Sequence, residues 1–347
     1  MIKLLIVDDS ALMRKLLEKI FNETGEFDLR IARSGEEALE EIARDRPDVV
    51  TLDINMPGMG GLACLDRIMI EHPTPVVMVS SLTAEGERMT LEALRCGAVD
   101  FVTKPGRAIS LEIDTLRVQL LEKVRAASRA RLRGTHRLKE RVRHRIGAPP
   151  ARRESEPGEG LVLVGTSTGG PPALELLLQN LPEGFRWPVV VAQHMPAGFT
   201  AALARRLDGL CAMTVVELDE PVVLRPGHAY IGKGDADIVI GRTAGALTGM
   251  SMAADRLYPW HPSTDRLVSS AMAACAPRRL IGVLMTGMGN DGAQAMTLLR
   301  AAGGRTIAEA EETAVIWGMP GELVKAGGAG WVLPLPKIAP LLRSLAG

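Results

Sequence analysis

The chain has 347 residues, 46% of them hydrophobic and 24% charged, and its 41 basic and 41 acidic residues leave a formal net charge of zero. This length favours two domains over a single core, and the balanced charge excludes a global field that would select a nucleic acid or another strongly charged partner. The first apolar run is too short for a signal peptide and ends in two aspartates, and no run approaches the ~20 apolar residues of a membrane span, so we expect a cytoplasmic protein without membrane insertion.

Residues 1 to about 122 alternate between short apolar runs and amphipathic helical patterns. Such alternation predicts a parallel sheet with helices on both faces. The segment from Ser34 to Glu37 has the form of a capping box at the start of one helix. We expect helices over residues 10–22, 34–45, 60–70, 85–96 and 110–130.

Polar residues directly follow the apolar runs of this first segment. Since the carboxyl ends of parallel strands share one edge of a sheet, we expect these residues to converge there. Three carboxylates at one edge repel one another unless a cation lies among them, and hard oxygen ligands suit Mg²⁺. Alternatively, Asp8 or Asp9 could simply cap the helix that begins near Ser10. The residues are Asp8, Asp9, Asp53, Ser80 and Lys104.

A lysine and a hydroxyl beside the carboxylates favour a phosphate site over simple helix caps. Lys104 can pair with phosphate, and Ser80 can hydrogen-bond a phosphoryl oxygen. Asp53 is central in the set and precedes a turn, so it is the best acceptor for an aspartyl phosphate.

Residues 123–158 differ sharply in composition from what precedes them. Arginine and lysine crowd the stretch from 123 to 153, where Glu140 is the single carboxylate. We expect a basic linker, helical at first and mobile later. A nucleic-acid output through this basic segment is an alternative, but the segment has no aromatic side chain for base stacking, and we expect no nucleic-acid partner.

From Leu161 onward the βα alternation resumes, which predicts a second α/β domain over residues 159–347. A stretch rich in glycine, proline and β-branched residues between 214 and 250 suggests short strands or hairpins. The buried-strand candidates are residues 161–164, 188–192, 280–285 and 305–308.

A glycine-rich turn follows the first strand of this domain. Its spacing Gly165-x-Ser167-x-Gly169 permits a tight turn that exposes a serine at a helix N-terminus. Free N–H groups there could stabilise an oxyanion. A phosphate-cradling loop or a plain βα turn would have the same pattern.

A serine nucleophile needs a base and an acid that orients it. His194 follows the next buried strand, and Asp291 follows a third, so Ser167, His194 and Asp291 can meet as a triad. An α/β-hydrolase would instead order its triad Ser, Asp, His and would need a later histidine such as His261. The spacing Gly287-x-Gly289-x-x-Gly292 also matches a dinucleotide fingerprint, but Asp291 would then point its charge at a pyrophosphate.

Residues 1–122 resemble the receiver domain of bacterial two-component response regulators. The resemblance rests on the segments 7–10, 52–57 and 103–105 and on Ser80. It implies a five-stranded, parallel, flavodoxin-like fold that a histidine kinase phosphorylates in the presence of Mg²⁺. It assigns the phosphoryl group to Asp53 and its sensing to Ser80, Phe101 and Lys104. The implied metal ligands are Asp8, Asp9, Asp53 and the backbone carbonyl of Asn55.

Residues 159–347 resemble the catalytic domain of chemotaxis protein-glutamate methylesterases, through the segments 165–170, 193–196 and 286–292. The resemblance implies a larger, mostly parallel α/β/α domain whose Ser167, His194 and Asp291 hydrolyse γ-glutamyl methyl esters of chemoreceptors. It implies glutamine deamidation as a second activity, with no cofactor for the hydrolysis. Thr168 is an expected oxyanion donor, and Met288 is expected near the site.

The order of receiver, linker and esterase, together with the resemblance, implies that the unphosphorylated receiver inhibits the esterase until Asp53 is phosphorylated. We expect a monomer. The alternative is a non-enzymatic response regulator whose second domain binds a nucleotide or phosphate through its glycine-rich loops.

Overall fold

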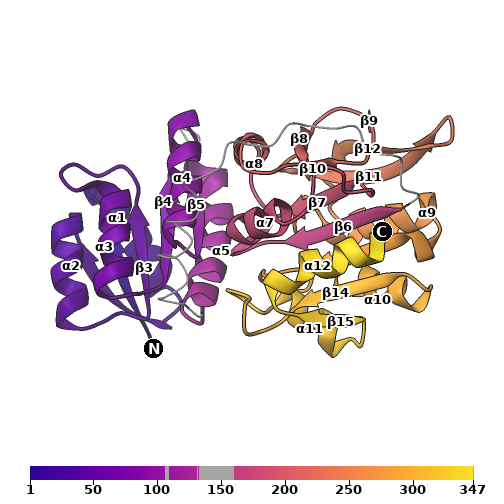
Figure 1. Cartoon of the computed structure of the whole chain (residues 1–347). Helices are drawn as coiled ribbons and strands as arrows, with labels where there is room; N and C mark the ends of the chain where they lie inside the picture. Colours follow the sequence, from indigo (N-terminus) through magenta and orange to yellow (C-terminus); the bar gives the residue numbers. More distant parts are fainter. Residues whose placement is uncertain (106–108, 131, 133–159, 347) are drawn as a thin grey trace. The chain divides into compact units, whose positions relative to one another are not determined.

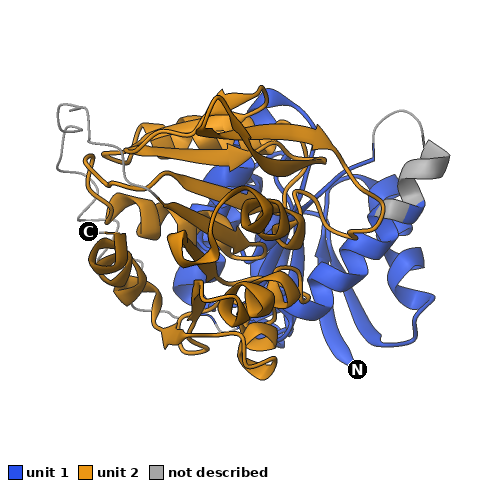
Figure 2. Cartoon of the chain, turned by 90° about the vertical axis from the view of Figure 1, so that its right-hand side faces the viewer, with its two compact units in different colours: residues 1–146 blue, residues 147–347 orange. Residues whose placement is uncertain are grey.

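The computed structural model describes residues 1–105, 109–130, 132 and 160–346, which belong to two compact units, residues 1–146 and 147–347 (Figures 1 and 2). Each unit has its own sheet and core. The expected linker, residues 123–158, is helical as far as Ala127, and its residues 131 and 133–158 lie outside the described part.

The first unit is a parallel five-stranded sheet with strand order β2-β1-β3-β4-β5, as the sequence predicts. Strands β3 and β4 are buried along their whole length, which is typical of central parallel strands. The strands are β1 (Ile2–Val7), β2 (Phe27–Ala32), β3 (Val49–Asp53), β4 (Val76–Ser80) and β5 (Asp100–Thr103). The helices are α1 (Ala11–Asn22), α2 (Gly35–Arg44), α3 (Gly60–Glu71), α4 (Ala84–Cys96) and α5 (Ile109–Ala127).

Side-chain caps explain where two of these helices begin. The hydroxyl of Ser10 accepts a hydrogen bond from the Met13 N–H, so Ser10 and not an aspartate caps α1. The hydroxyl of Ser34 accepts from the Glu37 N–H, while the Glu37 carboxylate accepts from the N–H of Arg33. The predicted capping box is therefore present, with its returning hydrogen bond shifted by one residue.

The second unit is built on a parallel seven-stranded sheet with order β15-β14-β13-β6-β7-β10-β8. Strands β6, β7 and β13 are buried throughout. The strands are β6 (Leu161–Thr166), β7 (Val189–Gln193), β8 (Thr214–Leu218), β10 (His228–Gly232), β13 (Leu280–Leu284), β14 (Arg305–Glu309) and β15 (Trp331–Leu333).

Helices cover both faces of this sheet. Helix α7 (Gly170–Gln179) packs beside α8 (Phe199–Asp208) and α12 (Leu335–Ala346). On the other face α10 (Ala293–Ala301) lies between α9 (Thr264–Ala274) and α11 (Met319–Lys325), as Figure 1 shows. The unit is therefore the three-layer α/β/α domain that the sequence predicts.

The stretch from 214 to 250 does more than form hairpins. Two of its strands, β8 and β10, extend the parallel sheet. The others form a separate antiparallel sheet of β9 (Val222–Val223), β11 (Ala236–Thr243) and β12 (Ala246–Ala253), in which β11 packs on α9. This second sheet places β11 beside α9 and beside residues 261–263, which lead into that helix.

Strand order places one switch point, where open α/β sheets form a crevice, in each unit. The direction in which successive strands are added to the sheet reverses between β1 and β3 in the first unit and between β6 and β13 in the second. Ligands of open α/β sheets bind outside the carboxyl ends of strands at such switch points. The first crevice receives Asp8, Asp9 and Asp53, and the second receives Ser167 and Asp291.

The cysteines carry no disulfide. All four cysteines are free, and burial raises the pKa of Cys64 and Cys211 to about 12, which leaves both thiols unreactive at neutral pH. Among the described helices, none is both long and apolar enough to cross a bilayer.

Candidate active site

The acidic edge of the first unit brings its three predicted aspartates together. Ligand atoms of Asp8, Asp9 and Asp53 lie within 4.8 Å of one another. The Lys104 ammonium lies 2.7 Å from Asp53 Oδ2 and 3.0 Å from Asp8 Oδ2. Asp53 is only 1% exposed, whereas Asp9 is open to solvent. A buried carboxylate thus faces a lysine inside an otherwise anionic cluster.

Burial and charge act against each other on this pair. Burial raises the pKa of Asp53, and the hydrogen bond and charge of Lys104 only partly offset that effect. Burial alone would lower the pKa of Lys104, but the hydrogen bond and charge of Asp53, and then the charge of Asp8, raise it. The lysine therefore stays charged and can compensate an anion formed at Asp53.

The other predicted residues of the first site lie on β4, on β5 and just after β3. The Thr90 hydroxyl donates to Ser80 Oγ over 2.8 Å, and Ser80 Oγ in turn faces the Gly86 carbonyl oxygen at 3.4 Å. Phe101 is buried below the Lys123 ammonium, which lies 5.1 Å from its ring centroid. The backbone N–H of Asn55 donates to Asp53 Oδ1 over 3.2 Å, so Asn55 adjoins the cluster.

The donor set of this edge fits Mg²⁺. Three carboxylates whose oxygens lie within 4.8 Å supply hard ligands, and the exposed position of Asp9 leaves room for water. The lysine already balances part of their charge.

In the second unit, Ser167 lies in the turn between β6 and α7. The Ser167 N–H donates to the Thr286 carbonyl oxygen over 3.0 Å, and its own carbonyl oxygen accepts from the Gly170 N–H over 2.8 Å. Gly169 has a φ of +76°, a left-handed conformation that glycine adopts without strain. The turn therefore holds the serine at the start of α7, where the first N–H groups of a helix have no partner within the helix.

His194 and Asp291 meet at the same sheet edge. His194 Nε2 lies 2.7 Å from Asp291 Oδ2, and the His194 N–H donates to the Thr166 carbonyl oxygen over 3.1 Å. No hydrogen bond joins the Ser167 hydroxyl to His194 in the described part of the chain. Catalytic hydrogen bonds are often long before substrate binds, so this geometry does not argue against the pair.

The environment of Asp291 determines which imidazole nitrogen is basic. Asp291 is 3% exposed, and burial alone would raise its pKa. The hydrogen bond and charge of His194, followed by N–H groups of Asp265 and Thr264, instead hold that pKa below its usual range. An ionised carboxylate only accepts hydrogen bonds, so a neutral His194 carries its proton on Nε2. Nδ1, which is buried and has no hydrogen-bond partner in the described structure, is then the basic nitrogen.

Thr168 directly follows Ser167 in the turn, and Met288 directly follows a glycine that lies against Ser167. The Thr168 carbonyl oxygen accepts from the Thr286 hydroxyl over 2.9 Å, which fixes the turn after Ser167. Met288 follows Gly287, whose Cα is so close to Ser167 that a Cβ on Gly287 would come within 2.8 Å of Ser167 Cβ. Any side chain at Gly287 would therefore displace the serine.

The site contains a buried glutamine, Gln193, to which the sequence assigned no role. Gln193, only 1% exposed, donates from Nε2 to the carbonyl oxygens of both Ser167 and His194, each over 3.1 Å. A single amide group thus ties together the backbones of two candidate catalytic residues. Its place immediately before His194 was the one signal in the sequence.

The loop between β12 and α9 also contributes unpredicted residues. The Trp260 ring lies parallel to the His194 imidazole, with an interplanar angle of 8° and 6.1 Å between centroids. The Ser263 hydroxyl donates to Asp291 Oδ1 over 3.0 Å. His261, the later histidine that an α/β-hydrolase triad would need, instead donates from Nδ1 to Asp237 Oδ1 over 2.9 Å.

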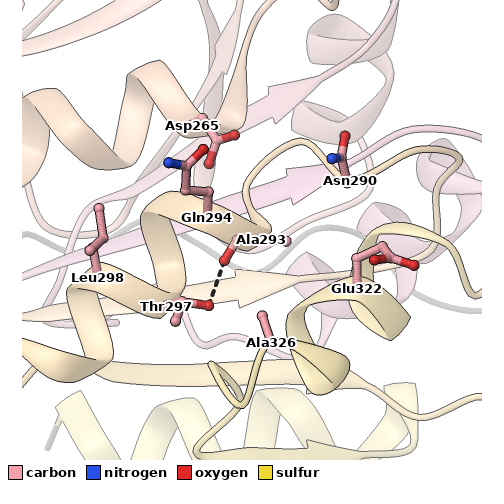
Figure 3. Close-up of a pocket in the computed structure, with 8 residues that line it drawn as sticks. All are labelled: Asp265, Asn290, Ala293, Gln294, Thr297, Leu298, Glu322 and Ala326. Carbon is pink, nitrogen blue, oxygen red and sulfur yellow. Dashed lines mark hydrogen bonds between the residues drawn. The ribbon is translucent and has the colours of Figure 1, made fainter.

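A cavity of about 350 Å³ lies on the side of the Asp291 loop that faces α10 and α11 (Figure 3). Gln294 points toward Asp265, and Glu322 projects from the facing helix. None of the three candidate triad residues lines it, so it is not the place of the triad chemistry. Its lining residues are Asp265, Asn290, Ala293, Gln294, Thr297, Leu298, Glu322 and Ala326.

Two known domain families match this chain, one in each of its two units. Residues 4–113 match the response regulator receiver domain, and residues 162–342 match the CheB methylesterase domain.

Whole proteins and a solved domain show the same likeness. A protein-glutamate methylesterase/protein-glutamine glutaminase of Rhodopseudomonas palustris is 56% identical over 98% of this chain and 96% of its own length. A counterpart from Rhodospirillum rubrum is 52% identical over 99% of this chain and 96% of its own. The crystal structure of the Thermotoga maritima CheB methylesterase catalytic domain aligns with a TM-score of 0.52 and 37% identity, covering 54% of this chain and 98% of that domain.

Proposed function

This chain belongs to the CheB methylesterase family, and from that membership we propose that it hydrolyses γ-glutamyl methyl esters of chemoreceptors. Deamidation of glutamine side chains is the proposed second activity, because an amide and an ester pass through the same acyl-enzyme. The observation that carries the proposal is the 2.7 Å contact between His194 Nε2 and Asp291. It leaves Nδ1 buried, without a hydrogen-bond partner among the described residues, at the strand edge that bears Ser167.

In the proposed acylation step, Ser167 Oγ attacks the ester carbonyl carbon while its proton passes to His194 Nδ1. N–H groups of the turn that contains Thr168, at the N-terminus of α7, stabilise the oxyanion. His194 then gives the proton to the departing methoxide, so that methanol leaves and the γ-carboxyl group is esterified to Ser167. Asp291 keeps the imidazole in its tautomer and stabilises the imidazolium.

Water completes the cycle. His194 Nδ1 takes a proton from the attacking water, the acyl bond breaks, and the proton returns to Ser167 Oγ, which leaves a free glutamate on the substrate. Gln193 supports both steps because its amide holds the Ser167 and His194 backbones at a fixed separation. We propose that this hydrolysis uses no cofactor.

The alternative, a non-enzymatic second domain that binds nucleotide or phosphate, is disfavoured by charge. Asp291 lies inside the Gly287–Gly292 turn as a buried carboxylate with a lowered pKa, where a pyrophosphate would need N–H donors. Methanol release from methylated receptor fragments, measured beside labelling with a serine-reactive fluorophosphonate, tests the proposal. A protein that releases no methanol and takes up no label would support the binding alternative.

We further propose that residues 1–122 are a receiver that inhibits the esterase, residues 159–347, across the linker at 123–158 until a histidine kinase phosphorylates Asp53. A phosphoryl group on Asp53 would compete for the Lys104 ammonium, now 2.7 Å from the carboxylate. It would also attract the Ser80 hydroxyl, now engaged with Thr90 and Gly86 of α4. Phosphorylation would thereby reach α4 through Ser80, and Phe101 would adjust in the core beside it.

Mg²⁺ at Asp8, Asp9, Asp53 and the Asn55 carbonyl would neutralise the acidic edge and orient the incoming phosphoryl group. Because Mg²⁺ would bind only the folded receiver, ten times its dissociation constant should add about 1.4 kcal/mol to the free energy of unfolding. Urea unfolding of the full chain with MgCl₂ or with EDTA measures this. In Asp9→Asn the gain should vanish.

The exposed Asp28→Asn on β2 is the matched control and should keep the Mg²⁺ gain. Equal gains in Asp9→Asn and in the control would mean that Mg²⁺ binds elsewhere.

A further inference from the structure

A second buried carboxylate, Asp237 on β11, lies behind the triad. Asp237 is 1% exposed, and each of its oxygens accepts two hydrogen bonds. Oδ1 accepts from His261 Nδ1 over 2.9 Å and from the Ser263 N–H over 2.8 Å. Oδ2 accepts from the Asp255 N–H over 2.9 Å and from Arg266 Nη1 over 2.7 Å. The guanidinium balances the buried charge.

These four donors lie on the loop 254–263 and the first turn of α9. Asp255 is at the start of the loop, and His261 and Ser263 are at its end. Asp237 therefore fixes both ends of one loop to β11. Burial alone would raise the pKa of Asp237, but His261, the two N–H groups and Arg266 lower it, so the carboxylate is an acceptor throughout the neutral range.

The same loop touches the triad at two points. The Ser263 hydroxyl donates to Asp291 Oδ1 over 3.0 Å, and the next residue, Thr264, donates its N–H to Asp291 Oδ2 over 2.6 Å. The Trp260 ring lies parallel to the His194 imidazole and packs on Gly289, since a Cβ on Gly289 would come within 2.8 Å of that ring. The loop thus supports the acid and the base of the triad together.

We propose that Asp237 is a positioning residue for the hydrolysis: by holding the loop 254–263, it keeps Ser263 on Asp291 and Trp260 over His194. Asp237 touches neither substrate nor Ser167 in this scheme and acts only through the loop. The inference rests on the proposed function. It assigns to a carboxylate 54 residues before Asp291 in the sequence a measurable part in the reactivity of Ser167.

The test uses the full chain. Asp237→Asn keeps the size of the side chain but turns one acceptor into a donor that faces other donors. We expect kcat for methanol release to fall about 10-fold with KM within about 2-fold, and fluorophosphonate labelling to slow by the same factor. Asp237→Glu should recover part of the loss. Asp208→Asn is the control and should match wild type. It removes a carboxylate that accepts from the N–H of Val215, near the amino end of β8.

Comparison of a triple variant with a double variant separates positioning from general loss of stability. If Asp237 acts through Ser263 and Trp260, adding Asp237→Asn to the Ser263→Ala, Trp260→Phe pair should lower kcat little further, because residues that act as a unit are not additive. If the fold-losses in kcat instead multiply when the substitutions are combined, the inference is overturned. An Asp237→Asn enzyme with wild-type kcat and labelling rate would overturn it as well.

A variant that does not fold and an inactive wild-type chain are also informative. If Asp237→Asn does not fold, the Ser263→Ala and Trp260→Phe enzymes decide: wild-type kcat and labelling in both would overturn the inference, and slower labelling in both would support it. If the wild-type chain neither labels nor releases methanol, the proposed function fails and the inference fails with it. If wild type does both and the Asp237 variants equal it, the positioning role alone is wrong.

Discussion

Replacing Ser167 with alanine is expected to lower methanol release from a methylated receptor fragment by at least about 1,000-fold, because the acyl-enzyme can no longer form. The substitution removes one oxygen atom from the half-buried Ser167 and leaves in place the hydrogen bonds that the backbone of the turn makes, including those with Gln193 and Thr286, so the fold should persist. The measurement is methanol release at saturating substrate, with urea unfolding to confirm that the variant is folded.

The chain supplies a matched control for this experiment. Ser269→Ala changes an exposed serine on α9 and should leave the rate unchanged. His194→Ala should cost about as much as Ser167→Ala, and the double variant little more, since the two residues perform one step together. Near-normal turnover in Ser167→Ala would show that the nucleophile is a different group.

Replacing Asp53 with asparagine is expected to abolish activation by a small-molecule phosphodonor. In a two-state equilibrium whose active form is about 1–10% populated, phosphorylation of wild type should raise the rate about 10- to 100-fold. The asparagine variant has no carboxylate to phosphorylate, so its rates with and without the phosphodonor should be equal and low. Methanol release by the full chain under both conditions measures this.

Two comparisons make the regulatory experiment decisive. Asp28→Asn, an exposed acid on β2, should be activated like wild type. A fragment of residues 160–347, which has its own hydrophobic core, should be active without a phosphodonor if the receiver is inhibitory. Equal rates for the full chain with phosphodonor, the full chain without it, and the fragment would refute inhibition by the receiver.

Local pattern was sufficient to predict most of the fold. The helices expected at residues 10–22, 34–45 and 60–70 occur within one residue at each end, because amphipathic spacing, and serine caps in the first two, act over short distances. The pattern was less informative for residues 214–250, where short strands with similar composition join two different sheets. Which sheet a strand joins depends on distant partners and not on its own residues.

The candidate site likewise contains residues that could be predicted from local pattern and residues that could not. His194 and Asp291 could be predicted as neighbours because both follow buried strands, and parallel strands end at one edge. Gln193, Trp260 and Asp237 could not, since their roles depend on side-chain orientation and on loop contacts that no periodicity encodes. The structure alone also shows that Asp291 bonds Nε2, which leaves Nδ1 as the basic nitrogen.

The sequence by itself determined that two parallel α/β units each carry polar residues at their strand ends, because hydrophobic alternation and turn chemistry are local properties. Only the tertiary structure decided how those residues meet: which imidazole nitrogen faces the acid, which amide joins Ser167 to His194, and which distant carboxylate holds the loop beside them. The physical reason is that hydrogen bonds and ring contacts require distances of a few ångströms, and only the folded chain brings residues such as Asp237 and Asp291 into that range through Ser263.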